Sequence, residues 1–224
     1  MSAKNVPKVL DSSFLERLLS GVKEPAQRDL LEKQLNISVN TFLGFCYAIE
    51  DHPKFKDGTV NNVEFDGLKR LAKEACKFKG PIIEIGTLFG YSTMALAIGK
   101  TKNKSLFTID SFTWNPIGIT SKRHEELTRK SLCFLTETQN VEIIKSSSTD
   151  FYANYNVESP SMIFIDAAHD YESVKQDIEF SRRVQSNIIC GHDYNWPGVK
   201  QAVEESFGNT IETIGEIWVW REKS

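Results

Sequence analysis

The sequence predicts an α/β fold: a mostly parallel sheet of about seven strands, helices on both faces, a terminal antiparallel hairpin and an N-terminal helical extension. Two observations lead to this prediction. From residue 81 onward, short and nearly continuous apolar runs alternate with amphipathic helical patterns, as in parallel sheets covered on both faces. The last two β-prone runs are too close together to enclose a crossover helix, so they predict a hairpin.

Residues 1–62 are predicted to form the helical extension, as a cap or a dimer contact, and residues 63–224 the main domain. Apolar residues at helical spacing mark two short amphipathic stretches within 14–19 and 42–49, and no strand pattern accompanies them. A third helix is expected to carry the apolar face that runs from Leu68 to Phe78 and to stop at Gly80.

The predicted parallel strands are the apolar runs 81–86, 105–110, 141–146, 161–167 and 187–193. The predicted helices between and after them cover 92–99, 121–137, 170–183 and 197–207. The hairpin comprises 210–215 and 216–223. The run Lys122-Arg123-His124, at the start of the second of these helices, is expected to form a solvated face.

Composition limits the function classes. A chain of 224 residues with 40% hydrophobic and 25% charged content is an ordinary folded domain, which excludes disordered and fibrous classes. The net charge of −3 lacks the clustered basic excess of a dedicated DNA binder. The four widely spaced cysteines indicate free thiols, and neither a signal peptide nor a membrane span is visible. We expect a cytoplasmic protein without nucleic-acid or membrane partners, and leave a homo-oligomer open.

Ligands of an open α/β sheet bind beyond the carboxyl ends of its strands. The first such end, IIEIGTLFGYSTMALA, places Glu84, Gly86, Gly90 and Ser92 between a strand and a helix. A dinucleotide fingerprint would need glycine at positions 88 and 91, which hold leucine and tyrosine and would crowd a pyrophosphate. We therefore expect the loop to bind a ligand that has no phosphates at this point. The alternative is a tight turn that binds no ligand.

Asp110 ends the second run, 24 residues after Gly86. An acidic side chain at this place can accept hydrogen bonds from both hydroxyls of a ribose, although a helix cap or a solvated turn would also use one. A glycine loop followed by a ribose-binding acid indicates an adenosyl ligand. S-adenosylmethionine meets that description.

A second group of candidates follows two later strands. Asp166 and Asp193 end different strands, so a parallel sheet can bring them to one point, where two carboxylates repel unless they share a cation or a proton. Oxygen ligands favour Mg²⁺. His192 is either a third ligand, which would favour Mn²⁺ or Fe²⁺, or a donor that hydrogen-bonds a ligand, and the second alternative is preferred.

Four segments together resemble the class I S-adenosylmethionine-dependent methyltransferases: IIEIGTLFGYSTMALA, LFTIDSF, MIFIDAAHDYESVKQDI and GHDYNWPGVKQAVEE. The nearest branch contains the metal-dependent macrocin-type sugar O-methyltransferases and is related in layout to catechol O-methyltransferase. The resemblance covers about 81–222, whereas the first 60 or so residues match no family that we can name. It implies a Rossmann-like seven-stranded sheet and an S-adenosylmethionine-binding methyltransferase domain.

The resemblance also implies roles for single residues. Gly86 and the backbone near it would hold the methionine part of the cofactor, Glu84 would organise the loop, Ser92 would lie near the methionine carboxylate, and Asp110 would bind the ribose. The segment Ser146-Ser147-Ser148 stands where relatives often have Gly-Asp-Ser near the adenine, which is a departure from the pattern. The Ser147 hydroxyl would still be able to contact the adenine. The expected cofactor-binding residues are Glu84, Gly86, Gly90, Ser92, Asp110, Ser147 and Asp166.

In the resembled branch, the residues that match Asp166 and the pair His192-Asp193 bind the metal, Mg²⁺ or Mn²⁺, and His169 matches the catalytic base. Imidazole can take a hydroxyl proton near neutral pH, while Asp170 caps the following helix. The implied reaction is methyl transfer to a hydroxyl oxygen of a small-molecule acceptor, with His169 and Asp166 as catalytic residues. A metal-dependent hydroxylase-like enzyme on the same scaffold and a non-catalytic adenosyl-ligand-binding module remain the alternatives.

Overall fold

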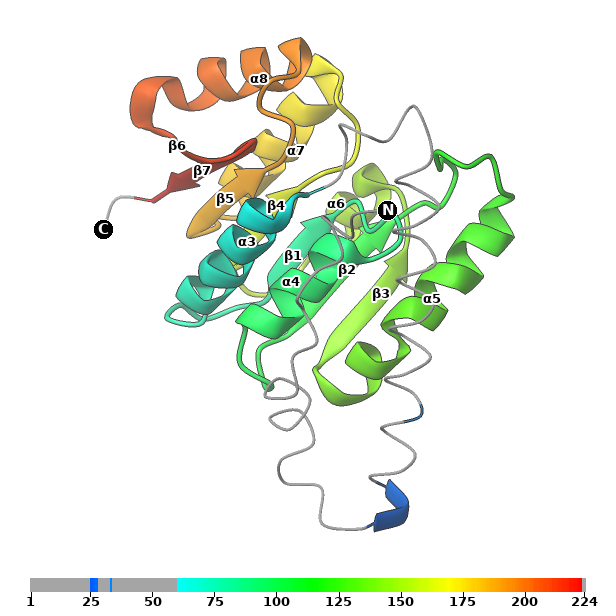
Figure 1. The fold of residues 1–224 in the computed structure, drawn as a ribbon. Coiled ribbons are helices and arrows are strands. Elements are labelled where there is room, and N and C mark those ends of the chain that lie inside the picture. Colours follow the sequence, from blue (N-terminus) through cyan, green and yellow to red (C-terminus); the bar gives the residue numbers. More distant parts are fainter. Residues whose placement is uncertain (1–24, 28–32, 34–59, 223–224) are drawn as a thin grey trace.

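A computed structural model describes residues 25–27, 33 and 60–222 of the chain. Both amphipathic stretches predicted in the N-terminal extension lie outside the described residues. Residues 60–222 contain a seven-stranded sheet in the order β3-β2-β1-β4-β5-β7-β6 (Figure 1). The predicted mostly parallel sheet with a terminal antiparallel hairpin is confirmed.

Five strands pair in parallel: β1 (Ile82–Ile85), β2 (Leu106–Asp110), β3 (Val141–Lys145), β4 (Met162–Ile165) and β5 (Ile188–Gly191). The hairpin strands β6 (Glu212–Ile214) and β7 (Ile217–Arg221) are antiparallel, and β7 pairs with β5. The helices are α3 (Asn62–Ala75), α4 (Tyr91–Gly99), α5 (Ser121–Thr138), α6 (Ser148–Asn154), α7 (Tyr171–Arg183) and α8 (Pro197–Phe207), followed by the 3₁₀ turn η2 (Gly208–Thr210).

The sheet separates two apolar cores. One core joins the sheet to α3, α4 and α5 and contains Leu68, and the other joins it to α6, α7 and α8 and contains Ile178. Neighbouring strand residues alternate between the cores, with Ile82 in the first and Ile83 in the second. Both faces of the sheet are therefore covered, which explains why its strands read as continuous apolar runs. Figure 1 shows α3 and α4 in front of the sheet.

Two helical predictions need correction. The helix α3 ends at Ala75 with Cys76 as its cap, and Phe78, expected on its apolar face, lies beyond the helix with 38% of its surface exposed. The helix α6 was not predicted, because it is only seven residues long and Tyr152 is its single buried side chain. A helix this short carries too little periodicity to be recognised from its sequence.

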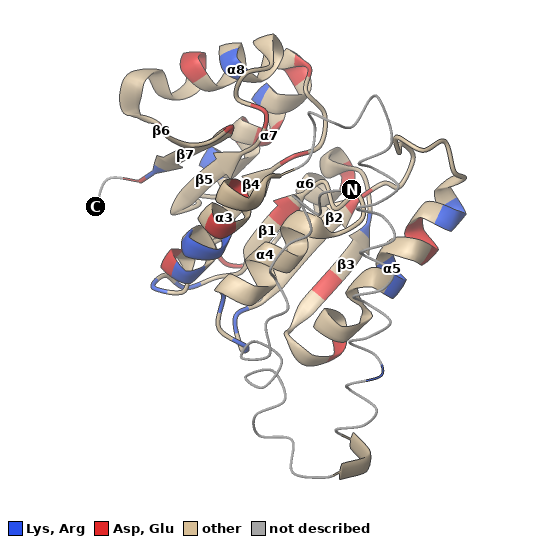
Figure 2. Cartoon of the chain, in the orientation of Figure 1, with Lys and Arg blue, Asp and Glu red and all other residues tan. Residues whose placement is uncertain are grey.

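The outer surface is ordinary for a folded domain. Charged residues of both signs follow one another along α5 and α8 (Figure 2). Within the described part of the chain, no helix is long and apolar enough to cross a membrane. Cys76 and Cys190 are free thiols as expected, while Cys46 lies outside the described residues.

The strand order reverses direction between β1 and β4, which are hydrogen-bonded neighbours. In an open α/β sheet, ligands bind at such a reversal, beyond the carboxyl ends of the two strands. The predicted site residues Gly86 and Asp166 directly follow these two strands. The topology thus places both groups of candidates at the position where this class of fold binds ligands.

Candidate active site

A tight turn joins β1 to α4, and its backbone is held from two sides. The Asp110 carboxylate accepts hydrogen bonds from the amides of Thr87 (3.0 Å) and Leu88 (2.8 Å). On the other side, the carbonyl of Leu88 accepts bonds from His124 Nε2 (2.8 Å) and the Thr128 hydroxyl (2.6 Å). Leu88 has a left-handed φ of 47°, which is unfavourable for leucine. These bonds offset that cost and keep the turn in one shape.

The expectation that His124 lies on a solvated face is wrong. Lys122 and Arg123 are exposed, but His124 is buried against the rings of Phe89 and Phe112, with centroid distances of 4.7 and 5.1 Å. The reason is helical geometry, since His124 shares the inward face of α5 with the threonine one turn later. The two charged residues that precede His124 led to the wrong prediction for a residue that supports the turn.

Asp110 has a structural task that the sequence analysis did not anticipate. It ends β2 half-buried, and besides the two amides of the turn it accepts a bond from the amide of Phe112 (2.6 Å) through Oδ1. Each carboxylate oxygen has two lone-pair sites, so these bonds leave acceptor capacity for a further ligand. A change at Asp110 would therefore disturb the turn as well as any ligand that it binds.

Glu84 lies on β1 beneath the turn and is completely buried. Its Oε2 accepts bonds from the hydroxyls of Thr93 (2.5 Å) in α4 and Thr108 (2.6 Å) in β2. Burial raises the pKa of this carboxyl to about 7, because the charged form loses its hydration. Glu84 thus joins the first helix after the turn to the neighbouring strand.

Replacing Glu84 with glutamine should remove part of the pH dependence of stability. The pKa rises from 4.5 to about 7 on folding, so between these values the native state binds the proton more tightly and stability falls as pH rises. Above this window, ionisation of Glu84 should cost the wild type up to about 3 kcal/mol. Denaturant titrations at about pH 5 and about pH 8.5 measure the change for both proteins. Equal changes would contradict the prediction.

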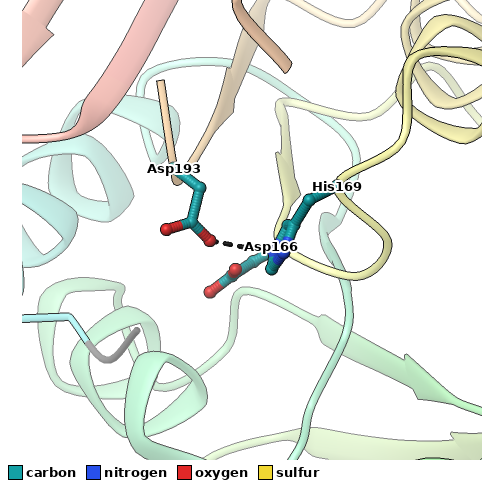
Figure 3. Close-up of side chains that lie close together, drawn as sticks. All are labelled: Asp166, His169 and Asp193. Atoms are coloured by element: carbon teal, nitrogen blue, oxygen red, sulfur yellow. Dashed lines mark ion pairs between the residues drawn. The ribbon is translucent and has the colours of Figure 1, made fainter. Parts of the chain in front are cut away.

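The ends of β4 and β5 bring Asp166, His169 and Asp193 together (Figure 3). Backbone pairing sets this arrangement, because the amide of Asp166 bonds to β1 and the amide of His192 bonds to β4. His169 Nε2 lies 2.9 Å from Asp193 Oδ2. One side-chain ligand atom from each of the three residues lies within 4.8 Å of the others.

Charge interactions perturb each member of this cluster. Burial alone would raise the pKa of Asp193, but hydrogen bonds with His169 and His192 hold it well below its usual range. The hydrogen bond to Asp193 raises the pKa of His169. Burial raises the pKa of Asp166 to about 6, against the opposing effect of His192. Perturbed groups gathered at strand ends in this way are typical of functional sites.

Glu64 joins the site although it was not predicted. It lies in the first turn of α3, is 1% exposed, and places Oε2 3.2 Å from His192 Nε2. The other ring nitrogen of His192 lies 3.4 Å from Asp193 Oδ2 and 3.9 Å from Asp166 Oδ1. A sequence signal existed, because Glu64 falls on the same helical face as Leu68, where an unpaired acid would be costly.

The remaining predicted residues lie at the same end of the sheet. Gly90 caps α4 with a left-handed φ of 92°, and Ser92 is buried in the first turn of that helix. Ser147 follows β3 and caps α6, with its hydroxyl accepting a bond from the amide of Asp150 (3.0 Å). Asp170 caps α7 as expected, by accepting a bond from the amide of Ser173 (3.0 Å).

An exposed indole borders the cluster. The ring of Trp196, which is 52% exposed, lies 5.3 Å from the ring of His169 at an interplanar angle of 36°. Trp196 immediately precedes α8, so the turn after β5 presents it beside Asp193. The imidazole therefore has a carboxylate on one side and an aromatic surface nearby.

The cluster is chemically suited to a divalent cation. Two carboxylates and at least one imidazole form a donor set that Mg²⁺ or Mn²⁺ accepts. Asp193 Oδ1 is buried without a hydrogen-bond partner among the described residues, so one strong acceptor is left unsatisfied there. The three-residue grouping contains His169, whereas the predicted ligand set was Asp166, His192 and Asp193. Both histidines present nitrogens to the same carboxylates.

Comparison with known proteins places this geometry in a family. A family model described as a methyltransferase domain matches residues 83–194, which is half of the chain and includes the turn after β1 and the cluster. A search of curated proteins found no match.

Solved structures share the fold at low identity. An O-methyltransferase from Bacillus cereus, in complex with SAH, is 19% identical over 93% of this chain and 97% of its own, with a TM-score of 0.58. The O-methyltransferase NovP is 14% identical over 87% and 98%, with a TM-score of 0.61. TomG from Streptomyces achromogenes, an O-methyltransferase of tomaymycin synthesis in complex with SAM, is 18% identical over 80% and 89%, with a TM-score of 0.57. The family match and the shared fold confirm the resemblance found in the sequence: the chain belongs to the methyltransferase domain family.

Proposed function

We propose that the protein transfers a methyl group from S-adenosylmethionine to a hydroxyl oxygen of a small-molecule acceptor, assisted by a divalent metal. One observation carries the proposal: the turn held by Asp110 and the cluster around His169 lie at the ends of adjacent strands, at the point where the strand order reverses. The O-methyltransferases with the same fold, two of them in complex with SAH or SAM, support this choice of cofactor and reaction.

The turn and its neighbours would bind the cofactor. Gly86 and Gly90 would hold its methionine part, Ser92 its carboxylate, Asp110 its ribose and Ser147 its adenine. When bound, S-adenosylmethionine supplies a methyl group that is already activated on a sulfonium. The contribution of the chain is therefore largely to position the two reactants and to exclude water.

His169 would act as the general base. Its Nε2 lies against the buried Asp193 carboxylate, which orients the ring, so the neutral imidazole carries its proton on Nε2 and keeps Nδ1 as the acceptor. The bound cofactor would supply its methyl group to the acceptor oxygen and keep the sulfur, leaving as S-adenosylhomocysteine. His169 would take the hydroxyl proton.

Asp166 and Asp193 would hold the metal, with His192 beside them. A bound Mg²⁺ or Mn²⁺ lowers the pKa of a hydroxyl group that it ligates. A homo-oligomer, a cytoplasmic location and a capping role for residues 1–62 stay predictions.

Calorimetry with S-adenosylhomocysteine tests the cofactor assignment. The wild type should bind it, and Asp110→Ala should weaken binding by about 10–100-fold, because hydrogen bonds to a charged group are lost and the turn loosens. Asp66→Ala is the matched control, since Asp66 is an exposed carboxylate on α3 whose one ion-pair partner within the described part of the chain is Lys69. Its affinity should equal that of the wild type. A wild-type protein that binds no S-adenosylhomocysteine would refute the proposed function.

A further inference from the structure

Glu64 is rigidly held from several directions. Its carboxylate accepts hydrogen bonds from the amides of Asn61 (2.8 Å) and Glu216 (2.8 Å). Asn61 returns bonds to the first turn of α3, which completes a capping box. Gly215 in the turn between β6 and β7 packs so closely that an added Cβ would lie 2.4 Å from Glu64 Oε1. Two elements outside the matched region 83–194 thus fix the position of this carboxylate.

This carboxylate determines which nitrogen of His192 carries a proton. Glu64 Oε2 lies 3.2 Å from Nε2, and an anionic oxygen accepts hydrogen bonds but cannot donate one. Both oxygens of this carboxylate already accept hydrogen bonds from backbone amides, Oε2 from Asn61 and Oε1 from Glu216, so the group acts as an acceptor. Nε2 must therefore hold the proton that Glu64 accepts.

The opposite edge of the ring then faces the cluster. Nδ1 lies 3.4 Å from Asp193 Oδ2 and 3.9 Å from Asp166 Oδ1, and His192 is 5% exposed. A lone pair between two carboxylate oxygens is repelled unless a proton or a cation lies among them. In metal sites, a ligating histidine usually donates its second N–H to a carboxylate or carbonyl, which is the arrangement that Glu64 provides.

We propose that Glu64 is a positioning residue, which fixes His192 with its proton on Nε2 and presents Nδ1 to the Asp166–Asp193 pair as a nitrogen ligand for a divalent metal. The inference rests on the proposed function for the presence of a metal and adds the composition of its ligand set. A nitrogen ligand shifts the preference of an oxygen site away from Mg²⁺ toward transition metals such as Mn²⁺, Fe²⁺ or Co²⁺.

Metal binding without substrate tests the proposal. Co²⁺ and Mg²⁺ are titrated separately by calorimetry into the wild type, Glu64→Gln and Asn61→Ala, with the visible absorption of Co²⁺ as a second signal. The Glu64→Gln amide can donate to Nε2 and stabilise the other tautomer, so Co²⁺ affinity should fall about 10–100-fold and its absorption band should change. Mg²⁺, held by oxygens, should change by less than about threefold.

Asn61→Ala is the control for a merely structural role of Glu64. It removes the side-chain cap of α3, which should cost about 1 kcal/mol of stability, and leaves the contact between Glu64 and His192 in place. Its Co²⁺ and Mg²⁺ affinities should match those of the wild type. A similar loss of Co²⁺ binding in this variant would assign the effect to the helix and overturn the proposal.

A measurement on the wild type keeps the inference testable if Glu64→Gln does not fold. With the diamagnetic ion Zn²⁺ bound, ¹⁵N spectra of the imidazoles should show His192 protonated on Nε2, and His192→Asn should lose that signal. A proton on Nδ1, or Co²⁺ affinity unchanged in Glu64→Gln, overturns the assignment. If S-adenosylhomocysteine binding is normal, either result would leave the proposed function intact. Failure of the Glu64 assignment is therefore distinguishable from failure of the proposed function.

Discussion

Replacing His169 with alanine is expected to lower turnover by about 10²–10⁴-fold while the affinity for S-adenosylhomocysteine stays within about threefold of the wild type. The large effect would follow from the loss of the proposed proton acceptor. The small effect on affinity follows because the contacts of His169 are with Asp193 and Trp196, and not with the turn after β1. Release of S-adenosylhomocysteine with an acceptor found by screening hydroxyl compounds measures turnover, and calorimetry measures affinity.

The pH profile provides a second signature of this base. The hydrogen bond to Asp193 raises the pKa of His169 above its ordinary value of 6.5, and a general base must be deprotonated to work. Wild-type turnover should therefore rise with pH, with a midpoint above that value. This rise of turnover with pH should be absent from the residual activity of His169→Ala, because the variant has no imidazole at position 169.

Asp170→Ala is the matched control for His169→Ala. It removes the neighbouring side chain, which caps α7, and should cost about 1 kcal/mol of stability without reducing turnover. If His169→Ala kept turnover within a few-fold of the wild type, the base assignment would be wrong. If both variants lost turnover equally, the cause would be the start of α7 rather than the imidazole.

The sheet and its two groups of strand-end residues were predictable because their signals are local. A buried parallel strand must be apolar throughout, so the runs ending at Gly86, Asp110 and Asp166 could be read without knowing their neighbours. The same rule of topology brings strand ends together whatever their separation in sequence. The predicted candidates were thus placed at one edge of the sheet by the fold class alone.

The residues that were missed act through contacts that no local pattern encodes. His124 follows two charged residues, yet its helical phase turns it inward toward the carbonyl of Leu88, 36 positions away. Glu64 and His192 are separated by 128 positions and meet only because α3 packs beside the end of β5. The position of Glu64 on an apolar helical face indicated that the carboxylate must have a partner. The identity of the partner required the three-dimensional structure.

Gly86→Ala should be the most damaging single-methyl change in the site. Gly86 has a φ of +99°, and an added Cβ would lie 2.0 Å from the backbone carbonyl oxygen of Asp166. That oxygen belongs to the main chain at the end of β4, which is hydrogen-bonded to β1, so it cannot rotate away as a side chain would. Strain and overlap together should lower the free energy of unfolding by about 3 kcal/mol or more and abolish S-adenosylhomocysteine binding.

Gly118→Ala separates the effect of strain from the effect of overlap. Gly118 also has a positive φ of +68°, but an added Cβ there would meet no atom of the described residues within 4 Å. This variant bears the conformational strain alone and should lose only about 1 kcal/mol, with S-adenosylhomocysteine affinity within about threefold of the wild type. Denaturant unfolding and calorimetry on both variants measure the difference. If the two variants lost equal stability, the close approach of Gly86 to Asp166 would not matter. A much larger loss in Gly86→Ala would show that the close packing of the turn after β1 against the Asp166 backbone contributes to stability beyond the strain of a positive φ.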